Sequence, residues 1–164
     1  MPEAEAAVAI IKTSTDDYLL LQRASNPQDP WSGHLSLPGG RREDEDDSLL
    51  ATAIRECKEE CGIQLSEDDL LEVRPQRLAG RYAGDPILVA PFLFELQSRQ
   101  ELHLDETEIA DAWWVEKAQL INDDRHFEQA MTADKEQLFP VVRIDESAIL
   151  WGFTYEVLFE LLRE

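Results

Sequence analysis

Three glutamates and one arginine have a spacing that could hold a divalent metal ion. Glu56, Glu59 and Glu60 lie within one five-residue stretch, and a helix would bring their carboxylates onto one arc because residues three and four apart are neighbours. Arg55 precedes Glu59 by four residues and can hold its carboxylate in place. Crowded carboxylates repel one another, whereas Mg²⁺ or Mn²⁺ binds oxygen ligands readily. The pattern therefore indicates a metal site. A solvated acidic helix face is the alternative, and the glutamates alone do not separate the two.

A helix is predicted from Ser48 to Cys61 to position these side chains. The segment has no Gly or Pro. Asp46, Asp47 or Ser48 can cap its start, and Gly62 suits its end. The Gly39-Gly40 turn before it lets backbone approach a phosphate or a metal. One apolar arc of the helix is predicted to be buried, with both cysteines as free thiols: Leu50, Ala53, Ile54, Cys57 and Cys61.

The remaining segments predict a mixed α+β arrangement. Strands are expected at residues 5–12, 18–23, 35–37, 70–82, 86–96, 108–115 and 139–144. The first two should pair as a hairpin, Pro75 should mark an edge or a bulge, and residues 86–96 should lie at the sheet centre. Residues 115–121 suit a short helix, and Ser147 is expected to cap a final one. Loops are predicted at residues 24–34 and 122–138, the second as a mobile flap, and residues 1–164 are read as one domain.

The charge balance limits the classes of partner. The 164 residues carry 35 acids and 15 bases, a formal net charge of −20, so a basic surface for bare nucleic acid is not expected. No apolar run approaches membrane-spanning length. The apolar run near the start is short and follows glutamates rather than lysine or arginine, unlike a signal peptide. A cytoplasmic location is the resulting expectation, and dimerisation stays open.

Several of these residues resemble the Nudix box. Gly40, Arg55-Glu56, Cys57, Glu59-Glu60 and Gly62-Ile63 stand at its characteristic positions, so the box occupies approximately residues 40–63. The resemblance implies an α/β/α sandwich with a mixed central sheet. It also implies an Mg²⁺- or Mn²⁺-dependent pyrophosphohydrolase that cleaves a nucleoside diphosphate linked to another moiety.

The loop of the box departs from the common pattern. Counting back from Arg55, the box glycine falls on Arg41 and the first glutamate on Asp47, so the loop is one residue longer. This longer loop, together with Gly33, resembles a coenzyme A pyrophosphatase branch. The segments 51–53 (Ala-Thr-Ala) and 151–154 (Trp-Gly-Phe-Thr) also fit that branch. Asp29, however, stands where the branch has a basic residue, which argues against coenzyme A because a 3′-phosphate needs nearby cations.

The resemblance also implies roles for individual residues. Glu56, Glu59 and Glu60 would bind metal, and Arg55 would orient them. The general base would be Glu59 or Glu108, with neither preferred. Asp46 or Asp47 would support the helix start or hold a metal-bound water. The substrate would contact the backbone of Gly39 and Gly40. Its phosphates would contact the side chains of Arg23, Arg41 and Arg42.

The expected partner is a small nucleoside diphosphate derivative. Coenzyme A or its thioesters are one class. ADP-ribose, dinucleotides and nucleoside triphosphates are alternatives, and so is a catalytically silent domain that senses a nucleotide. Specificity is expected to depend on residues 24–34 and 122–138, neither of which shows a recognisable pattern.

Overall fold

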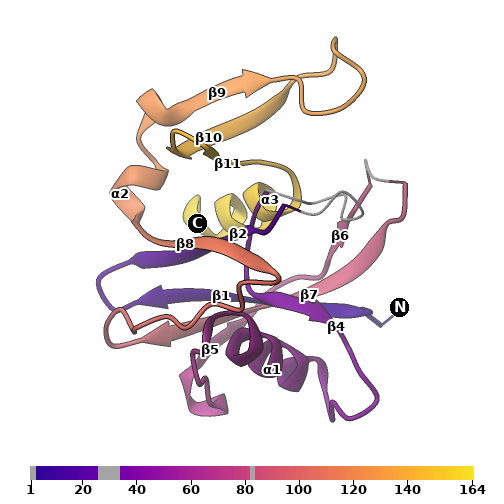
Figure 1. Ribbon diagram of the computed structural model, residues 1–164, viewed down its shortest axis with the longest axis vertical. Helices are drawn as coiled ribbons and strands as arrows, with labels where there is room; N and C mark the ends of the chain where they lie inside the picture. The colour runs from indigo at the N-terminus through magenta and orange to yellow at the C-terminus, as the bar shows by residue number, and fades with distance from the viewer. Residues whose placement is uncertain (1–2, 26–33, 82–83) are drawn as a thin grey trace.

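An eight-stranded sheet forms the centre of the molecule in the computed structural model, which describes residues 3–25, 34–81 and 84–164 (Figure 1). The expected features at Asp29 and Gly33 lie outside the described residues. The strands of this sheet are β1 (Ala6–Thr13), β2 (Asp17–Arg23), β3 (Leu35–Ser36), β4 (Gly39–Arg41), β5 (Leu70–Val73), β6 (Arg77–Ala79), β7 (Ile87–Leu96) and β8 (Ile109–Glu116).

The sheet is mixed, as expected. β1 pairs antiparallel with β2, which confirms the hairpin, and it pairs parallel with β7 along the whole of β1. β7 also pairs with β5 and β6 on its other side, so the run predicted for the sheet centre is an interior strand that lies next to the edge, and β1 lies at the centre. The strand is interrupted between β5 and β6 around Pro75, which cannot donate to the ladder, although the Arg74 N–H still donates to the Pro91 carbonyl.

Strand alternation divides the core between the two faces of the sheet. On β1, Ala7, Ala9 and Ile11 face one core, and Ile10 faces the other. The helix α1 (Leu49–Cys61) covers the first core, and α3 (Gly152–Leu162) packs into the second. Figure 1 shows the two helices on opposite sides of the sheet. This arrangement confirms the predicted α+β class.

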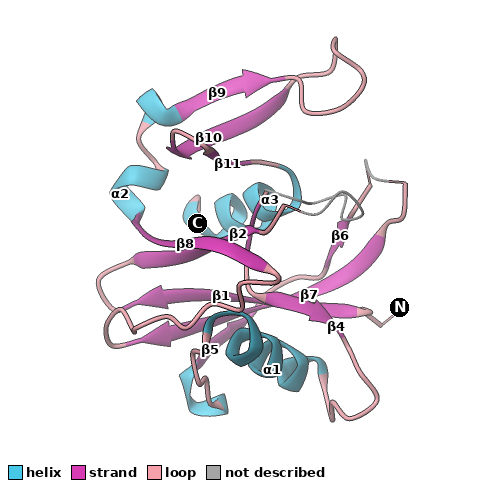
Figure 2. Cartoon of the chain, in the orientation of Figure 1, coloured by secondary structure: helices cyan, strands magenta, loops and turns pink. Residues whose placement is uncertain are grey.

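A second, three-stranded sheet stands beyond α3, which corrects two expectations (Figure 2). It consists of β9 (His126–Gln129), β10 (Phe139–Asp145) and β11 (Ala148–Leu150). Residues 122–138 are thus not a flap throughout, because their polar sequence includes β9, whose backbone pairs with β10. Ser147 does not cap the final helix either. It precedes β11, and Trp151 occupies the N-cap position.

The remaining helical elements are short. The helix α2 (Lys117–Leu120) lies within the segment expected to contain a short helix. Two 3₁₀ turns, η1 (Glu67–Asp69) and η2 (Asp123–Arg125), connect strands. Within the described residues, no helix is long and apolar enough to cross a membrane.

Candidate active site

The helix α1 begins and ends at capped residues. The Ala51 N–H donates to Ser48 Oγ over 3.1 Å, and Gly62 ends the helix with φ 78°, a left-handed conformation that favours glycine. On the buried arc, the Cys57 and Cys61 sulfurs lie 3.7 Å apart as free thiols, as predicted. The hydrogen bond between them, together with burial, raises the pKa of Cys57. The helix therefore has a fixed start, end and rotation about its axis.

Arg55 ties the loop to the helix. Its Nε and Nη2 donate to the two Asp46 carboxylate oxygens over 2.8 and 2.9 Å, a bidentate pair. Its Nη1 donates to Glu56 Oε1 over 2.8 Å and to Glu59 Oε2 over 3.2 Å. The pair with Glu59 agrees with the helical spacing, but the shortest contacts are those with Asp46 and Glu56.

Asp46, rather than Asp47, is the loop acid that holds the helix start. Its side chain is 5% exposed. Besides Arg55, its Oδ2 accepts hydrogen bonds from the Thr52 hydroxyl and the Glu43 N–H, each over 2.9 Å. The Arg55 guanidinium holds the pKa of Asp46 well below its usual range. Asp47 is exposed, so the longer loop uses Asp46 to hold Arg55.

Two glycines bring the backbone against two of the glutamates. The Gly39 N–H donates to Glu60 Oε1 over 2.8 Å, and Glu60 is only 2% exposed. A Cβ on Gly40 would lie 2.7 Å from the Glu56 carboxyl carbon, closer than real contacts allow. The β4 backbone therefore lies directly on the carboxylates of α1, where a larger residue would displace them.

Burial leaves the charge of these glutamates poorly compensated. Burial, together with the neighbouring Glu56 and Glu108 carboxylates, raises the pKa of Glu60 to about 8. Burial also raises the pKa of Glu56, although Arg55 opposes this shift. Glu108, expected from sequence near the site, thus acts on both glutamates. Burial disfavours the ionised forms of Glu56 and Glu60. A cation bound to these two carboxylates would stabilise the ionised forms.

Glu59 differs from the other two predicted ligands. Its side chain is 56% exposed and turns to Arg55. Within the described ranges, no group of three or more His, Cys, Asp or Glu side chains is arranged to hold a metal ion. The fit to Mg²⁺ or Mn²⁺ therefore rests on donor chemistry, because Glu56 and Glu60 offer carboxylate oxygens at one turn of the helix.

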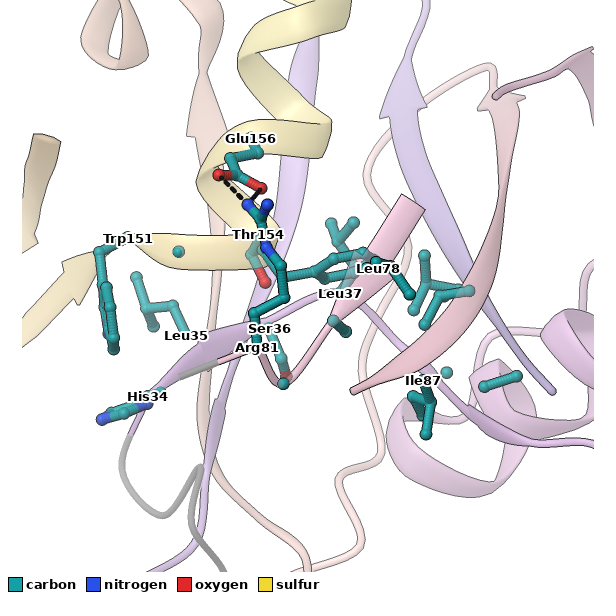
Figure 3. A pocket seen from close by; sticks show the side chains of 18 of the residues that line it. His34, Leu35, Ser36, Leu37, Leu78, Arg81, Ile87, Trp151, Thr154 and Glu156 are labelled. Atoms are coloured by element: carbon teal, nitrogen blue, oxygen red, sulfur yellow. Dashed lines mark hydrogen bonds and ion pairs between the residues drawn. The ribbon is translucent and has the colours of Figure 1, made fainter. Parts of the chain in front are cut away.

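A cavity of about 570 Å³ opens beside Gly39 and Gly40. This volume is typical of small-molecule sites. Its walls come from the central sheet, from the N-terminal end of α3 and from the chain after β9 (Figure 3). In Figure 3, Arg81 extends from the β6 side to Glu156 on α3, and the two are joined by an ion pair of 3.2 Å.

Four of the five predicted substrate-binding residues line this cavity: Arg23, Gly39, Gly40 and Arg41. Arg42 does not, because it donates to the Asp46 and Asp47 carbonyls and pairs with Glu3, and so braces the loop. Thr132, within the segment 122–138 on which specificity was expected to depend, also lines the cavity. Sequence reasoning missed Ser36, Arg81 and Glu156 of the lining, because they come from separate parts of the chain and no local signal marks them.

Comparison with known proteins decides the family. The NUDIX domain model matches residues 3–136. The chain belongs to the NUDIX family. The match includes β1, the glycine turn and α1, and it ends before β10 and α3.

Curated relatives of this Nudix chain agree with that assignment. An uncharacterized protein of Schizosaccharomyces pombe is 36% identical over 66% of the chain and 34% of its own length. An uncharacterized Nudix hydrolase, NudL, of Photorhabdus laumondii is 25% identical over 89% of the chain and 76% of the relative. The peroxisomal coenzyme A diphosphatase ndx-8 of Caenorhabditis elegans is 27% identical over 74% of the chain and half of the relative. The chain thus spans only about a third of the yeast protein and half of the worm protein. The expected enzyme class, a Nudix-type pyrophosphohydrolase, agrees with these relatives.

Solved structures agree with the Nudix fold. A MutT/nudix family protein of Enterococcus faecalis has a TM-score of 0.65 and 15% identity, and covers 98% of this chain and 62% of that one. The NUDIX domain of Shewanella oneidensis NrtR, solved with ADP ribose, has a TM-score of 0.59 and 21% identity, over 74% of this chain and 77% of that one. At these identities the likeness concerns the fold alone.

Proposed function

We propose that this Nudix domain is a metal-dependent pyrophosphohydrolase that cleaves the diphosphate of a nucleoside diphosphate linked to another moiety. One observation carries the proposal. Gly39 and Gly40 line the 570 Å³ cavity, and they also contact the side chains of Glu60 and Glu56, respectively. A diphosphate placed along this turn would lie between the acidic helix and the arginines of the cavity.

The residues divide into metal-binding, orienting and phosphate-binding groups. Glu56 and Glu60 would hold the metal, with Glu59 joining them if its side chain leaves Arg55. A bound Mg²⁺ or Mn²⁺ would neutralise phosphate charge and lower the pKa of attacking water. Arg55 orients the carboxylates, and Arg23 and Arg41 face the cavity where phosphate oxygens would lie. Both arginines offset the repulsion that a chain of −20 net charge imposes on a polyanion.

The position of Glu108 favours it as the general base. It acts electrostatically on both Glu56 and Glu60, which supports a role for it close to the proposed metal ligands. Glu59 remains the second candidate, although its carboxylate is held by Arg55 over 3.2 Å. Comparing Glu108→Gln with Glu59→Gln would separate them, because loss of the base lowers kcat and removes one limb of the pH profile.

Two relatives suggest different substrates. The worm relative is named a coenzyme A diphosphatase, which supports coenzyme A or its thioesters. The Shewanella domain was solved with ADP ribose, which supports that substrate or, alternatively, a sensor that binds it without turnover. A homodimer and a cytoplasmic location remain predictions from sequence.

The test is a substrate panel with product identification. The panel contains coenzyme A, ADP-ribose, NADH, dinucleoside polyphosphates and nucleoside triphosphates, each with Mg²⁺ or Mn²⁺ and with EDTA. Turnover of at least one substrate is expected with metal and not with EDTA. Glu60→Gln should lower kcat by about 100-fold or more, because it weakens metal binding while the Gly39 hydrogen bond is kept. Glu128→Gln, an exposed position on β9, controls for the charge change.

The same variant has a readout that does not depend on turnover. Mg²⁺ should raise the melting temperature of the wild type and not that of Glu60→Gln. Tight binding of one nucleotide without turnover would favour the sensor. Full activity of Glu60→Gln would contradict the metal assignment.

A further inference from the structure

We propose that Ser36 and Thr132 bind the uncharged nucleoside of the substrate in the cavity and so determine specificity. This inference rests on the proposed function for the substrate class, and it assigns the nucleoside to side chains that no sequence pattern marked.

The two hydroxyls lack hydrogen-bond partners. Within the described residues, three buried side-chain polar atoms have none: Ser36 Oγ, Thr132 Oγ1 and Trp114 Nε1. A buried hydroxyl without a hydrogen-bond partner destabilises the folded protein, so few are retained. Trp114 packs against the core under α1. Ser36 and Thr132, in contrast, both line the one cavity beside the glycine turn.

The positions of the two residues suit a ligand that extends from the diphosphate. Ser36 ends β3, three residues before Gly39, so it lies close in the chain to the turn beside the glutamates. Thr132 lies beyond β9, on the second sheet's side of the cavity. Rotation about each Cα–Cβ bond moves the hydroxyl between staggered positions. Such a rotation would let each oxygen meet a group that enters the cavity.

The wall at α3 favours an uncharged group. Its charged side chains, Arg81 and Glu156, pair with each other over 3.2 Å. The other arginines of the lining, Arg23 and Arg41, lie on β2 and β4, where the proposed diphosphate would bind. Much of the remaining wall is apolar or aromatic and includes Leu37, Leu78, Ile87, Trp151 and Phe153.

A nucleoside matches these walls. Its base has apolar faces and polar edges, and its ribose carries hydroxyls, so it can fill an apolar cavity and still give partners to Ser36 and Thr132. Every substrate of the proposed class carries a nucleoside, whereas the second moiety varies. The nucleoside is therefore the group that a fixed cavity beside the diphosphate site would recognise.

The test compares two probes that resist hydrolysis, measured by calorimetry with Mg²⁺ present. Adenosine α,β-methylene diphosphate carries the nucleoside, and methylene bisphosphonate lacks it. Ser36→Ala and Thr132→Val should each weaken binding of the first probe by about 3- to 10-fold, the value of one hydrogen bond. Binding of the bisphosphonate should not change. Ser98→Ala, at an exposed position away from the cavity, is the matched control.

Thermal stability distinguishes a ligand-binding hydroxyl from a structural one. Removing an unpartnered buried hydroxyl should leave the melting temperature unchanged or raise it. A hydroxyl that supports the fold through a bridging water would lower it instead. The proposal therefore expects weaker nucleotide binding without loss of stability.

Three results would overturn the proposal. They are equal weakening of both probes, unchanged binding of the nucleotide in both variants, and a nucleotide that binds no more tightly than the bisphosphonate. Inorganic tripolyphosphate tests the charge argument, because weaker binding of it in Ser36→Ala would show that phosphate, rather than the nucleoside, occupies the part of the cavity at Ser36. A domain that hydrolyses nothing but loses nucleotide affinity in these variants would contradict the proposed enzyme and leave this inference standing.

Discussion

The sites on the two faces of the central sheet differ in how their polar groups are partnered. On the α1 face, one continuous stretch, residues 38–63, pairs its own charges: Arg55 with Asp46 and Glu56, and Glu60 with the Gly39 N–H. On the α3 face, the cavity walls come from several distant segments, and the Ser36 and Thr132 hydroxyls have no partner among the described residues.

The difference suggests that the two faces have different functions. Metal chemistry needs carboxylates held within a narrow geometry, and a capped helix with an arginine clamp provides it locally. Recognition needs a shaped space with polar atoms free to meet a ligand, and only tertiary packing provides that. The NUDIX match includes α1 and also Ser36 and Thr132, and it stops at residue 136, before α3. Under the proposed function, α1 would supply the metal site and the cavity would supply recognition.

The largest expected effect separates the arginines of the two faces. Arg55→Ala should destabilise the protein by about 3 kcal/mol, because it leaves the buried Asp46 and the half-buried Glu56 without their cation. Arg77→Ala should cost under about 1 kcal/mol, because its pairs with Glu156 and Glu160 are partly exposed. Urea denaturation measures both values. Equal losses would remove the distinction between the buried pairs of Arg55 and the partly exposed pairs of Arg77.

A second comparison tests Gly39 and Gly40 of β4, which contact the glutamates of α1 and also line the cavity. A Cβ on Gly39 would lie 2.3 Å from the Ala7 carbonyl oxygen, a backbone atom of β1, so Gly39→Ala should cost about 1–3 kcal/mol of stability. A Cβ on Gly40 would meet the end of the Glu56 side chain, which can move away. Gly40→Ala should therefore keep its melting temperature and lower kcat by about 100-fold, since displaced ligands misplace the reaction.

The two glycine variants thus separate stability from activity. Melting curves and turnover of the best substrate from the panel are measured on both proteins. A Gly40→Ala variant that keeps full activity would show that the Glu56 carboxylate does not need its present position. A Gly39→Ala variant as stable as the wild type would contradict the close approach of β4 to β1.

The α1 face was predictable because its determinants are close in sequence. The Gly62 stop and the apolar arc of Cys57 and Cys61 were predicted correctly, and Ser48 was one of three adjacent residues expected as the cap. The box spacing also placed Glu56 and Glu60 near each other. The sequence did not show which loop acid would hold Arg55, because Asp46 and Asp47 are adjacent and only packing against Thr52 buries one of them.

The α3 face was less predictable for a physical reason. β9 has a polar sequence and forms a strand because β10 pairs with it, an interaction that periodicity in β9 alone does not reveal. Ser147 has the chemistry of a cap, yet the chain forms β11 before the helix begins. Arg81 and Glu156 are 75 residues apart, so nothing local indicates that they pair. Long-range pairing decides this face.

The smallest predicted effect is a change in the acid dependence of stability on the α1 face. Arg55 lowers the pKa of Asp46 in the folded protein below its value of 3.8 in the unfolded chain. The unfolded state therefore binds the proton at higher pH than the folded state does. The stabilisation is fully present above about pH 4 and is lost as the pH falls through the folded pKa. In the wild type, stability should decline in this acid range.

Asp46→Asn removes the titrating group and with it this part of the acid decline. The variant should be less stable than the wild type at neutral pH, because Arg55 loses a charged partner, and the two stabilities should converge as the pH falls below about 4. Urea midpoints from about pH 3 to about pH 7 measure the difference. Asp47→Asn, at the exposed neighbouring position, should follow the wild-type curve. If Asp47→Asn flattened the acid decline and Asp46→Asn did not, Asp47 would be the loop acid that responds to Arg55, and the assignment of the clamp would be reversed.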